Sequence, residues 1–99
     1  MAIKTKPFDA AKHFKTDEDQ VDLITDALET GHAGYIAAAL GTVTRARGMS
    51  DLAAETGLKR QSLYAALSEG GNPTLDTVLK VVHALGLELT VRERTLEHA

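Results

Sequence analysis

The stretch that decides the fold is residues 50–67, which read SDLAAETGLKRQSLYAAL. Two short helical segments, 50–56 and 60–68, flank Gly57, a residue type that adopts a positive φ without steric penalty. Ala53 lies four residues before this glycine, where a small side chain lets the second helix cross closely. The pattern predicts two helices joined by a tight turn. Four leucines are expected to fill the wedge between them: Leu52, Leu58, Leu63 and Leu67.

The second of these segments begins with a run of polar side chains. In a helix-turn-helix, the second helix lies in the DNA major groove with its N-terminal residues at the base edges. Arg suits guanine, Gln suits adenine, Ser donates or accepts, and an Ala methyl group can contact thymine. The sequence therefore predicts a DNA-reading helix. Its expected groove residues are Lys59, Arg60, Gln61, Ser62, Tyr64 and Ala65.

Residues on either side of this unit are candidates for contacts with DNA phosphates. Arg45 and Arg47 fall in the last turn of the preceding helix, where they also oppose the helix dipole. Ser50 is the expected N-cap of the next helix. Asn72 and Thr74 belong to a loop that precedes the last helix, with Thr74 as its expected cap. We expect phosphate contacts from Arg47, Ser50, Asn72 and Thr74 in addition to these structural roles.

Helical periodicity predicts three more helices, which makes the expected fold class all-α with five helices. The first follows Thr16, its expected cap, and ends at Gly31; the second covers about residues 34–47; the last covers 75–85 and ends at Gly86. The expected buried stripe of the first is Val21, Ile24 and Leu28, with Leu23 and Ala27 beside them. The expected stripes of the others are Tyr35, Ile36, Ala39, Leu40, Val43 and Ala46 in the second, and Leu75, Val78, Leu79, Val82 and Leu85 in the last.

The tail alternates between apolar and polar residues over 87–92, which predicts a short half-buried C-terminal β-strand. A lone strand is not stable, so this one should pair with residues 1–6 or with the same strand of a second copy. A homodimer is expected for a second reason, because dimers of such units read two half-sites about one helical turn apart. The strand and the last helix are the expected dimer contact.

Composition excludes several functional classes. The chain of 99 residues suffices for one core, and the absence of cysteine excludes a disulfide or a thiolate zinc site. No apolar run approaches the roughly 18 residues that span a bilayer, and residues 1–14 lack the apolar core of a signal peptide. The four histidines lack ligand spacing, and no serine has a local base. We expect a cytoplasmic, non-enzymatic protein without metal, cofactor or membrane partner.

Charge divides the chain into two parts. Residues 1–31 carry four lysines against seven acidic residues, net −3, whereas residues 32–86 carry five basic against four acidic residues, net +1. Such segregation indicates two surfaces with different partners. We therefore expect an N-terminal extension with an acidic helix at 1–31 and a DNA-binding domain with the C-terminal strand at 32–99.

Residues 32–91 resemble the Cro/repressor (XRE-type) helix-turn-helix, which implies a lambda-repressor-like fold. Nearly the whole chain resembles the addiction module antidote proteins, which are similar to HigA antitoxins. The motifs that carry this resemblance are KPFD at 6–9, ALETG at 27–31, ALG at 39–41, ARGM at 46–49, LYAALS at 63–68, GNPT at 71–74 and ALGL at 84–87. The sequence departs from the repressors near Met49, where many of them have a phosphate-binding Gln, so that contact is either absent or supplied by Ser50 or Arg47.

The resemblance implies a type II antitoxin that neutralises a RelE/ParE-like toxin and binds operator DNA to repress its own operon. Two alternatives stay open. One is a stand-alone phage-type repressor without a toxin. The other is an interaction module that kept the fold but no longer binds DNA, which the net charge of −3 favours.

Overall fold

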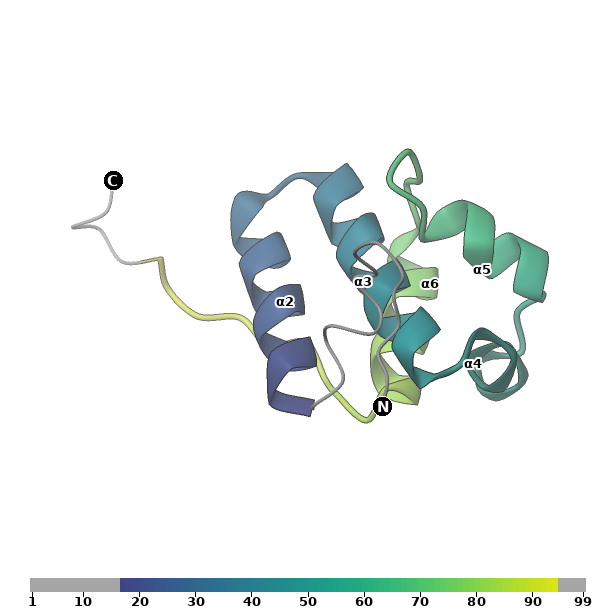
Figure 1. Cartoon of the computed structure of the whole chain (residues 1–99). Helices are drawn as coiled ribbons and strands as arrows, with labels where there is room; N and C mark the ends of the chain where they lie inside the picture. The colour runs from purple at the N-terminus through teal and green to yellow at the C-terminus, as the bar shows by residue number, and fades with distance from the viewer. Residues whose placement is uncertain (1–16, 95–99) are drawn as a thin grey trace, which may run out of the picture.

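The computed structural model describes residues 17–94, which form five helices (Figure 1). This result confirms the all-α prediction for the described residues. Helix α2 packs on α3, which leads into the α4–α5 pair, and α6 packs behind α4. No helix in this part of the chain combines the length and apolarity needed to cross a bilayer. The bounds are α2 (Asp17–Thr30), α3 (Ala33–Arg47), α4 (Met49–Thr56), α5 (Arg60–Ala66) and α6 (Leu75–Ala84).

Most helix ends follow the local signals. Gly31, Gly57 and Gly86 have φ values of 68°, 76° and 81°, so each lies in the region that favours glycine. Thr74 caps α6, because its Oγ1 accepts a hydrogen bond from the Thr77 backbone N–H at 3.1 Å. The expected cap Thr16 lies outside the described residues.

The prediction that Ser50 caps α4 is wrong, because α4 begins at Met49 and Gly48, two residues before Ser50, occupies the cap position. The Gly48 N–H closes α3 by donating to the Thr44 carbonyl at 2.8 Å, and its own carbonyl accepts from the Leu52 N–H at 3.1 Å. One glycine at φ 116° thus ends α3 and begins α4, which leaves Ser50 inside the first turn.

The hydrophobic core receives side chains from all five helices. Of the predicted wedge, Leu52, Leu63 and Leu67 are buried and Leu58 packs against them partly exposed, which confirms that prediction. The buried cluster consists of Ile24, Leu40, Val43, Met49, Leu52, Leu63, Leu67, Val81, Val82 and Leu85.

Some residues of the predicted buried stripes are exposed. On α2, the buried side chains are Gln20, Ile24 and Ala27, whereas Val21 and Leu28 each keep 39% of their surface exposed. The buried face of α2, the helix that packs on α3, is therefore centred on Gln20, Ile24 and Ala27. Tyr35 and Leu75 were also expected to be buried, but they are 55% and 69% exposed. Both lie in the first turns of their helices.

The predicted C-terminal strand is absent from the described residues. The Leu87 N–H donates to the Val82 carbonyl at 3.0 Å, and beyond it residues 88–94 make no backbone hydrogen bond with any other described residue. The chain instead runs past α2 without forming a sheet (Figure 1). The alternation predicts burial correctly up to Thr90, because Leu87 and Leu89 pack against the core while Glu88 and Thr90 are exposed. It fails at Val91, which is 98% exposed. A ladder also needs a second strand, and none lies beside this segment within residues 17–94.

Two glycines allow α5 to approach its neighbours closely. A Cβ at Gly41 of α3 would collide with the Leu67 carbonyl oxygen at the end of α5. A Cβ at Gly71 would collide in the same way with the Ala66 carbonyl oxygen. The position of α5 on the core therefore depends on the absence of a side chain at these two glycines as well as on the buried leucines.

Candidate nucleic-acid interface

The unit formed by α4, its turn and α5 is held by local hydrogen bonds. The Gly57 N–H donates to the Ala53 carbonyl at 3.0 Å, and the Thr56 Oγ1 accepts from the Leu58 N–H at 3.2 Å. Lys59 then has an extended backbone, and α5 starts directly after it. The angle between the two helices is thus determined by four consecutive residues at the turn.

Buried leucines decide which face of α5 is exposed. Leu63 is fully buried and Leu67 is 2% exposed, so this side of the helix is anchored in the core. The opposite side faces solvent. All six groove residues predicted from the sequence are exposed: Lys59, Arg60, Gln61, Ser62, Tyr64 and Ala65.

Arg60 is oriented by the aromatic side chain one turn further on. Its guanidinium carbon lies 5.5 Å from the centre of the Tyr64 ring, within the range of a cation–π contact. One guanidinium nitrogen also lies 3.4 Å from the Tyr64 hydroxyl. Because Tyr64 limits its rotamers, Arg60 would lose less conformational entropy when it binds a partner.

A shallow hollow of about 350 Å³ lies where α3, α4 and α5 meet. Arg45, Ser50, Arg60 and Tyr64 line it, so residues up to 19 positions apart come together at one surface. Asp51 lines the same hollow and adds one negative charge. Of the two α3 arginines that the sequence offers as phosphate-contact candidates, Arg45 is the one that lines this hollow.

Arg47 lies outside this hollow and makes structural hydrogen bonds. Its Nε donates to the Gln20 Oε1 at 3.2 Å, and a terminal nitrogen donates to the Leu85 carbonyl at 2.9 Å. Arg47 thereby joins α2, α3 and the end of α6. The periodicity of α3 alone could not reveal this role, because both acceptors lie far away in the sequence.

Asn72 and Thr74 are exposed in the loop before α6, and neither lines the hollow. His32 has a role that the sequence did not indicate: it caps α3. Its Nδ1 accepts hydrogen bonds from the backbone N–H groups of Gly34 and Tyr35 at 3.1 and 3.3 Å, and its ring stacks on Tyr35. Within residues 17–94, no group of three or more His, Asp or Glu side chains is arranged to hold a metal ion.

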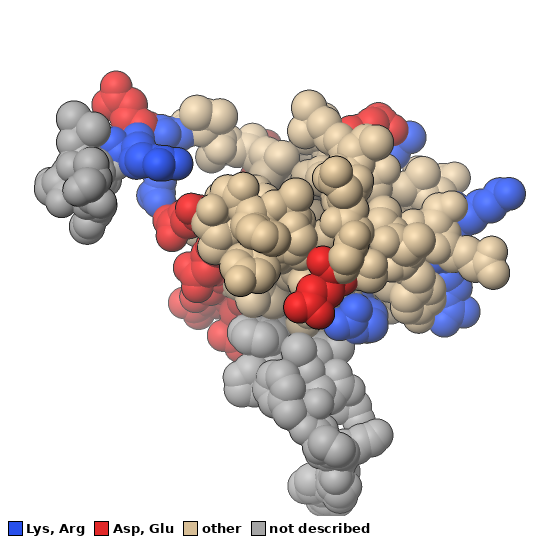
Figure 2. Space-filling model, turned by 90° about the horizontal axis from the view of Figure 1, so that it is seen from above, with Lys and Arg blue, Asp and Glu red and all other residues tan. Residues whose placement is uncertain are grey.

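Charge is segregated on the folded surface as well. Figure 2 shows acidic side chains along the α2 side of the molecule and basic side chains projecting from the opposite side, with a further basic group beside the acidic side, where Arg92 pairs with Glu29. Helix α2 contains no Lys or Arg, and its acidic residues from Glu18 onward are exposed. We call five of them the acidic stripe: Glu18, Asp19, Asp22, Asp26 and Glu29.

These features define a small all-helical protein that presents a polar helix face and an acidic helix face. Residues 4–93 match the sequence model of the family described as "Probable addiction module antidote protein", and the chain belongs to this family. The sequence is also 40% identical, over 93 residues, to an uncharacterized protein of Haemophilus influenzae strain Rd. That alignment covers 94% of this chain and 96% of the relative. No solved structure matches the chain significantly.

Family membership confirms the resemblance to the antidote proteins. An antidote of an addiction module is an antitoxin, and it implies a cognate toxin as partner. Antitoxin families are generally non-enzymatic.

Proposed function

We propose that this antitoxin neutralises a RelE/ParE-like toxin and represses its own operon by binding operator DNA as a homodimer. In this proposal, α4 and α5 form a lambda-repressor-like helix-turn-helix, and α5 enters the major groove. The observation that carries the proposal is the division of α5 into two faces. Leu63 and Leu67 are buried, while every predicted groove residue is exposed on the other side.

Each exposed residue on α5 has a proposed part in DNA recognition. Arg60, held against Tyr64, would donate two hydrogen bonds to a guanine, and Gln61 would pair with an adenine. Lys59 and Ser62 would add polar contacts, and the Ala65 methyl group would contact a thymine. Phosphate contacts would come from Arg45 and Ser50 at the hollow. Asn72 and Thr74 are proposed as phosphate contacts at the flank of the same site.

The test of DNA binding is a gel shift with the protein's own promoter at two salt concentrations. Phosphate contacts release counterions, so the affinity should fall steeply as salt rises. A protein that kept the fold as an interaction module would show no such shift, and the net charge of −3 together with Asp51 favours this second candidate. The stand-alone repressor is distinguished by its neighbouring genes, because an antitoxin should have a short basic reading frame immediately beside it.

Two arginines on α3 should respond differently to removal. Arg45→Ala is expected to weaken binding to all DNA sequences alike and to reduce the salt slope by about 1, because one phosphate contact is lost.

Arg47→Ala is expected to lower the free energy of unfolding by about 2 kcal/mol, because hydrogen bonds to Gln20 and Leu85 are lost. Urea unfolding and salt titrations of DNA binding measure both effects. If folded Arg47→Ala shows a smaller salt dependence of DNA affinity, Arg47 contacts a DNA phosphate as well.

The acidic stripe on α2 is the proposed toxin-facing surface. Its five carboxylates share one side of the helix, and α2 itself contributes no Lys or Arg, although Arg92 of the C-terminal segment pairs with Glu29 at 2.9 Å. A basic toxin surface would be steered toward such a stripe. This assignment follows the predicted division at residue 31, with residues 1–31 serving toxin binding and residues 32–99 serving DNA binding.

Charge reversal within the stripe should slow toxin binding without affecting DNA. For Asp22→Lys with Asp26→Lys, we expect the association rate with the toxin at low salt to fall about tenfold, because electrostatic steering is lost. Operator affinity should not decrease. The matched control is Glu69→Lys with Asp76→Lys, which changes the same charge elsewhere on the exposed surface. An equal loss of toxin binding in both double variants would show that net charge, and not this stripe, is responsible.

A further inference from the structure

The C-terminal segment 88–92 is an extended stretch of chain without regular secondary structure. Among the described residues, none donates to or accepts from its backbone N–H and C=O groups. Val91 is 98% exposed, the highest exposure of any large apolar side chain in the described residues. An apolar, unpaired edge of this kind is a template for pairing with another strand.

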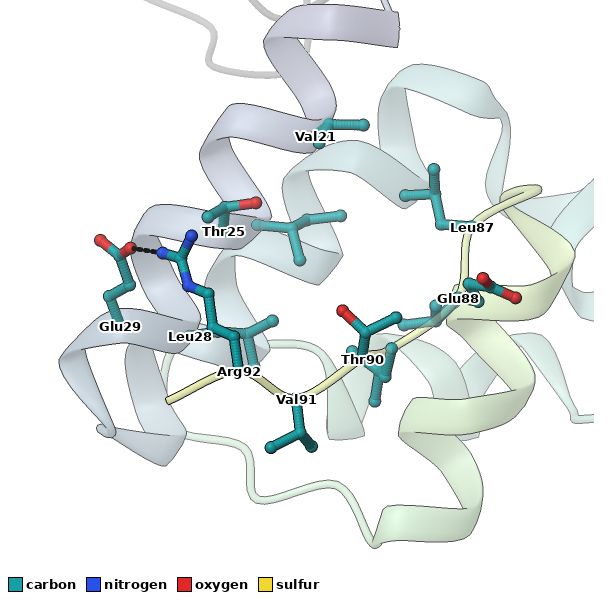
Figure 3. Close-up of a pocket in the computed structure, with 12 residues that line it drawn as sticks. Val21, Thr25, Leu28, Glu29, Leu87, Glu88, Thr90, Val91 and Arg92 are labelled. Carbon is teal, nitrogen blue, oxygen red and sulfur yellow. Dashed lines mark hydrogen bonds and ion pairs between the residues drawn. The ribbon is translucent and has the colours of Figure 1, made fainter. Parts of the chain in front are cut away.

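This segment also forms one wall of an apolar groove of about 530 Å³ against α2 (Figure 3). Val21 and Leu28 line the α2 side, and each is 39% exposed. Leu87 and Leu89 line the tail side, while Val91 points away from α2 at the rim. The groove and the exposed valine therefore belong to one continuous apolar surface.

The side-chain order in this segment is complementary to itself. If two copies pair antiparallel about a two-fold axis at Thr90, Glu88 lies opposite Arg92 of the second copy, and Leu89 lies opposite its Val91. Opposite charges meet on one face and apolar side chains on the other, and both kinds of cross-strand pair are stabilising. An axis at Leu89 instead places Glu88 opposite Thr90, and an axis at Val91 places Leu89 opposite Glu93. Of these three positions, only a two-fold axis at Thr90 pairs opposite charges on one face and apolar side chains on the other.

We propose that two copies of this chain pair through residues 88–92, antiparallel and centred on Thr90, so that a strand forms only on dimerisation. The inference rests on the proposed homodimer and specifies its contact and register. Val91 of one copy would cover Leu89 of the other at the mouth of the groove. Arg92, which already contacts the Glu29 carboxylate at 2.9 Å, has enough donors to bind Glu88 of the second copy as well.

Cysteine cross-linking tests the register, because the chain has no cysteine of its own. Thr90→Cys should form a disulfide-linked dimer on mild oxidation, since residues directly opposite each other have Cα atoms about 4.5–5.5 Å apart. Glu88→Cys and Arg92→Cys should each fail alone, because the two sulfur-bearing residues would lie about 13 Å apart along the strands. A mixture of these two variants should cross-link, because residues 88 and 92 face each other.

A second variant tests the contact without disturbing the single chain. Val91→Asp changes a side chain that is 98% exposed, so the fold should persist, but the dimer dissociation constant should rise at least tenfold. Analytical ultracentrifugation without DNA or toxin gives this value. The inference is overturned if Thr90→Cys cross-links no better than Glu88→Cys, or if Val91→Asp leaves dimerisation unchanged. Neither result would contradict DNA binding, because the gel shift tests the proposed function independently of this contact.

Discussion

Replacing Arg60 and Gln61 together by alanine is expected to lower operator affinity by about a hundredfold or more while toxin neutralisation stays intact. Each bidentate contact with a base contributes about 1–3 kcal/mol of discrimination, and the double variant removes two of them. Both side chains are exposed, so the free energy of unfolding should change by no more than about 0.5 kcal/mol per substitution. Gel shifts with specific and unrelated DNA, together with a toxin inhibition assay, measure the two activities.

The matched control for this double variant is Asp76→Ala with Lys80→Ala. These residues form an exposed ion pair on α6, 3.1 Å apart, so their removal also deletes two polar side chains from a helix surface. Operator binding should persist in the control. If the Arg60 and Gln61 variant is folded and loses both operator binding and toxin neutralisation, the model of two separate surfaces is wrong.

Gly41→Ala is expected to lower the free energy of unfolding by about 3 kcal/mol. The added methyl group would collide with the Leu67 carbonyl oxygen, and overpacking a tight core typically costs about 1–3 kcal/mol. We expect the upper end of this range because a backbone atom cannot escape by changing rotamer. For a domain of this size, the melting temperature should fall by more than about 10 °C. Thermal and urea unfolding followed by circular dichroism measure both quantities.

Gly70→Ala is the control for this substitution. A Cβ at Gly70 meets no atom within 4 Å, and its φ lies outside the range that requires glycine. Its stability should therefore stay within about 0.5 kcal/mol of the unchanged protein. Similar stabilities for Gly41→Ala and Gly70→Ala would mean that α5 can shift away from α3 at little energetic cost. In that event operator affinity should change, because Leu67 lies directly after the end of α5.

Local chemistry allowed the helices and the candidate DNA face to be predicted from the sequence. The run before and after Gly57 specifies two short helices and a left-handed turn residue, because φ preferences depend on single residues. Leu63 within α5 and Leu67 directly after it mark the buried side, and the polar residues beside them must then face outward. Helical periodicity is sufficient for both conclusions.

The cap of α4 was mispredicted for a local reason of another kind. Ser50 has the chemistry of an N-cap, but Gly48 already ends α3 and accepts the first hydrogen bond of α4. When two helices share one junction residue, the usual cap preference no longer decides where the second begins.

Tertiary structure alone decided the role of each α3 arginine, the buried face of α2 and the state of the tail. Arg45 and Arg47 are two residues apart, yet only Arg47 reaches the distant acceptors Gln20 and Leu85. The tail has the alternation of a strand, but backbone hydrogen bonds in a strand come from another segment, and residues 17–94 supply none. The sequence by itself therefore determined what each segment can form from its own residues. Burial, long-range hydrogen bonds and strand pairing depended on the neighbour that each segment meets.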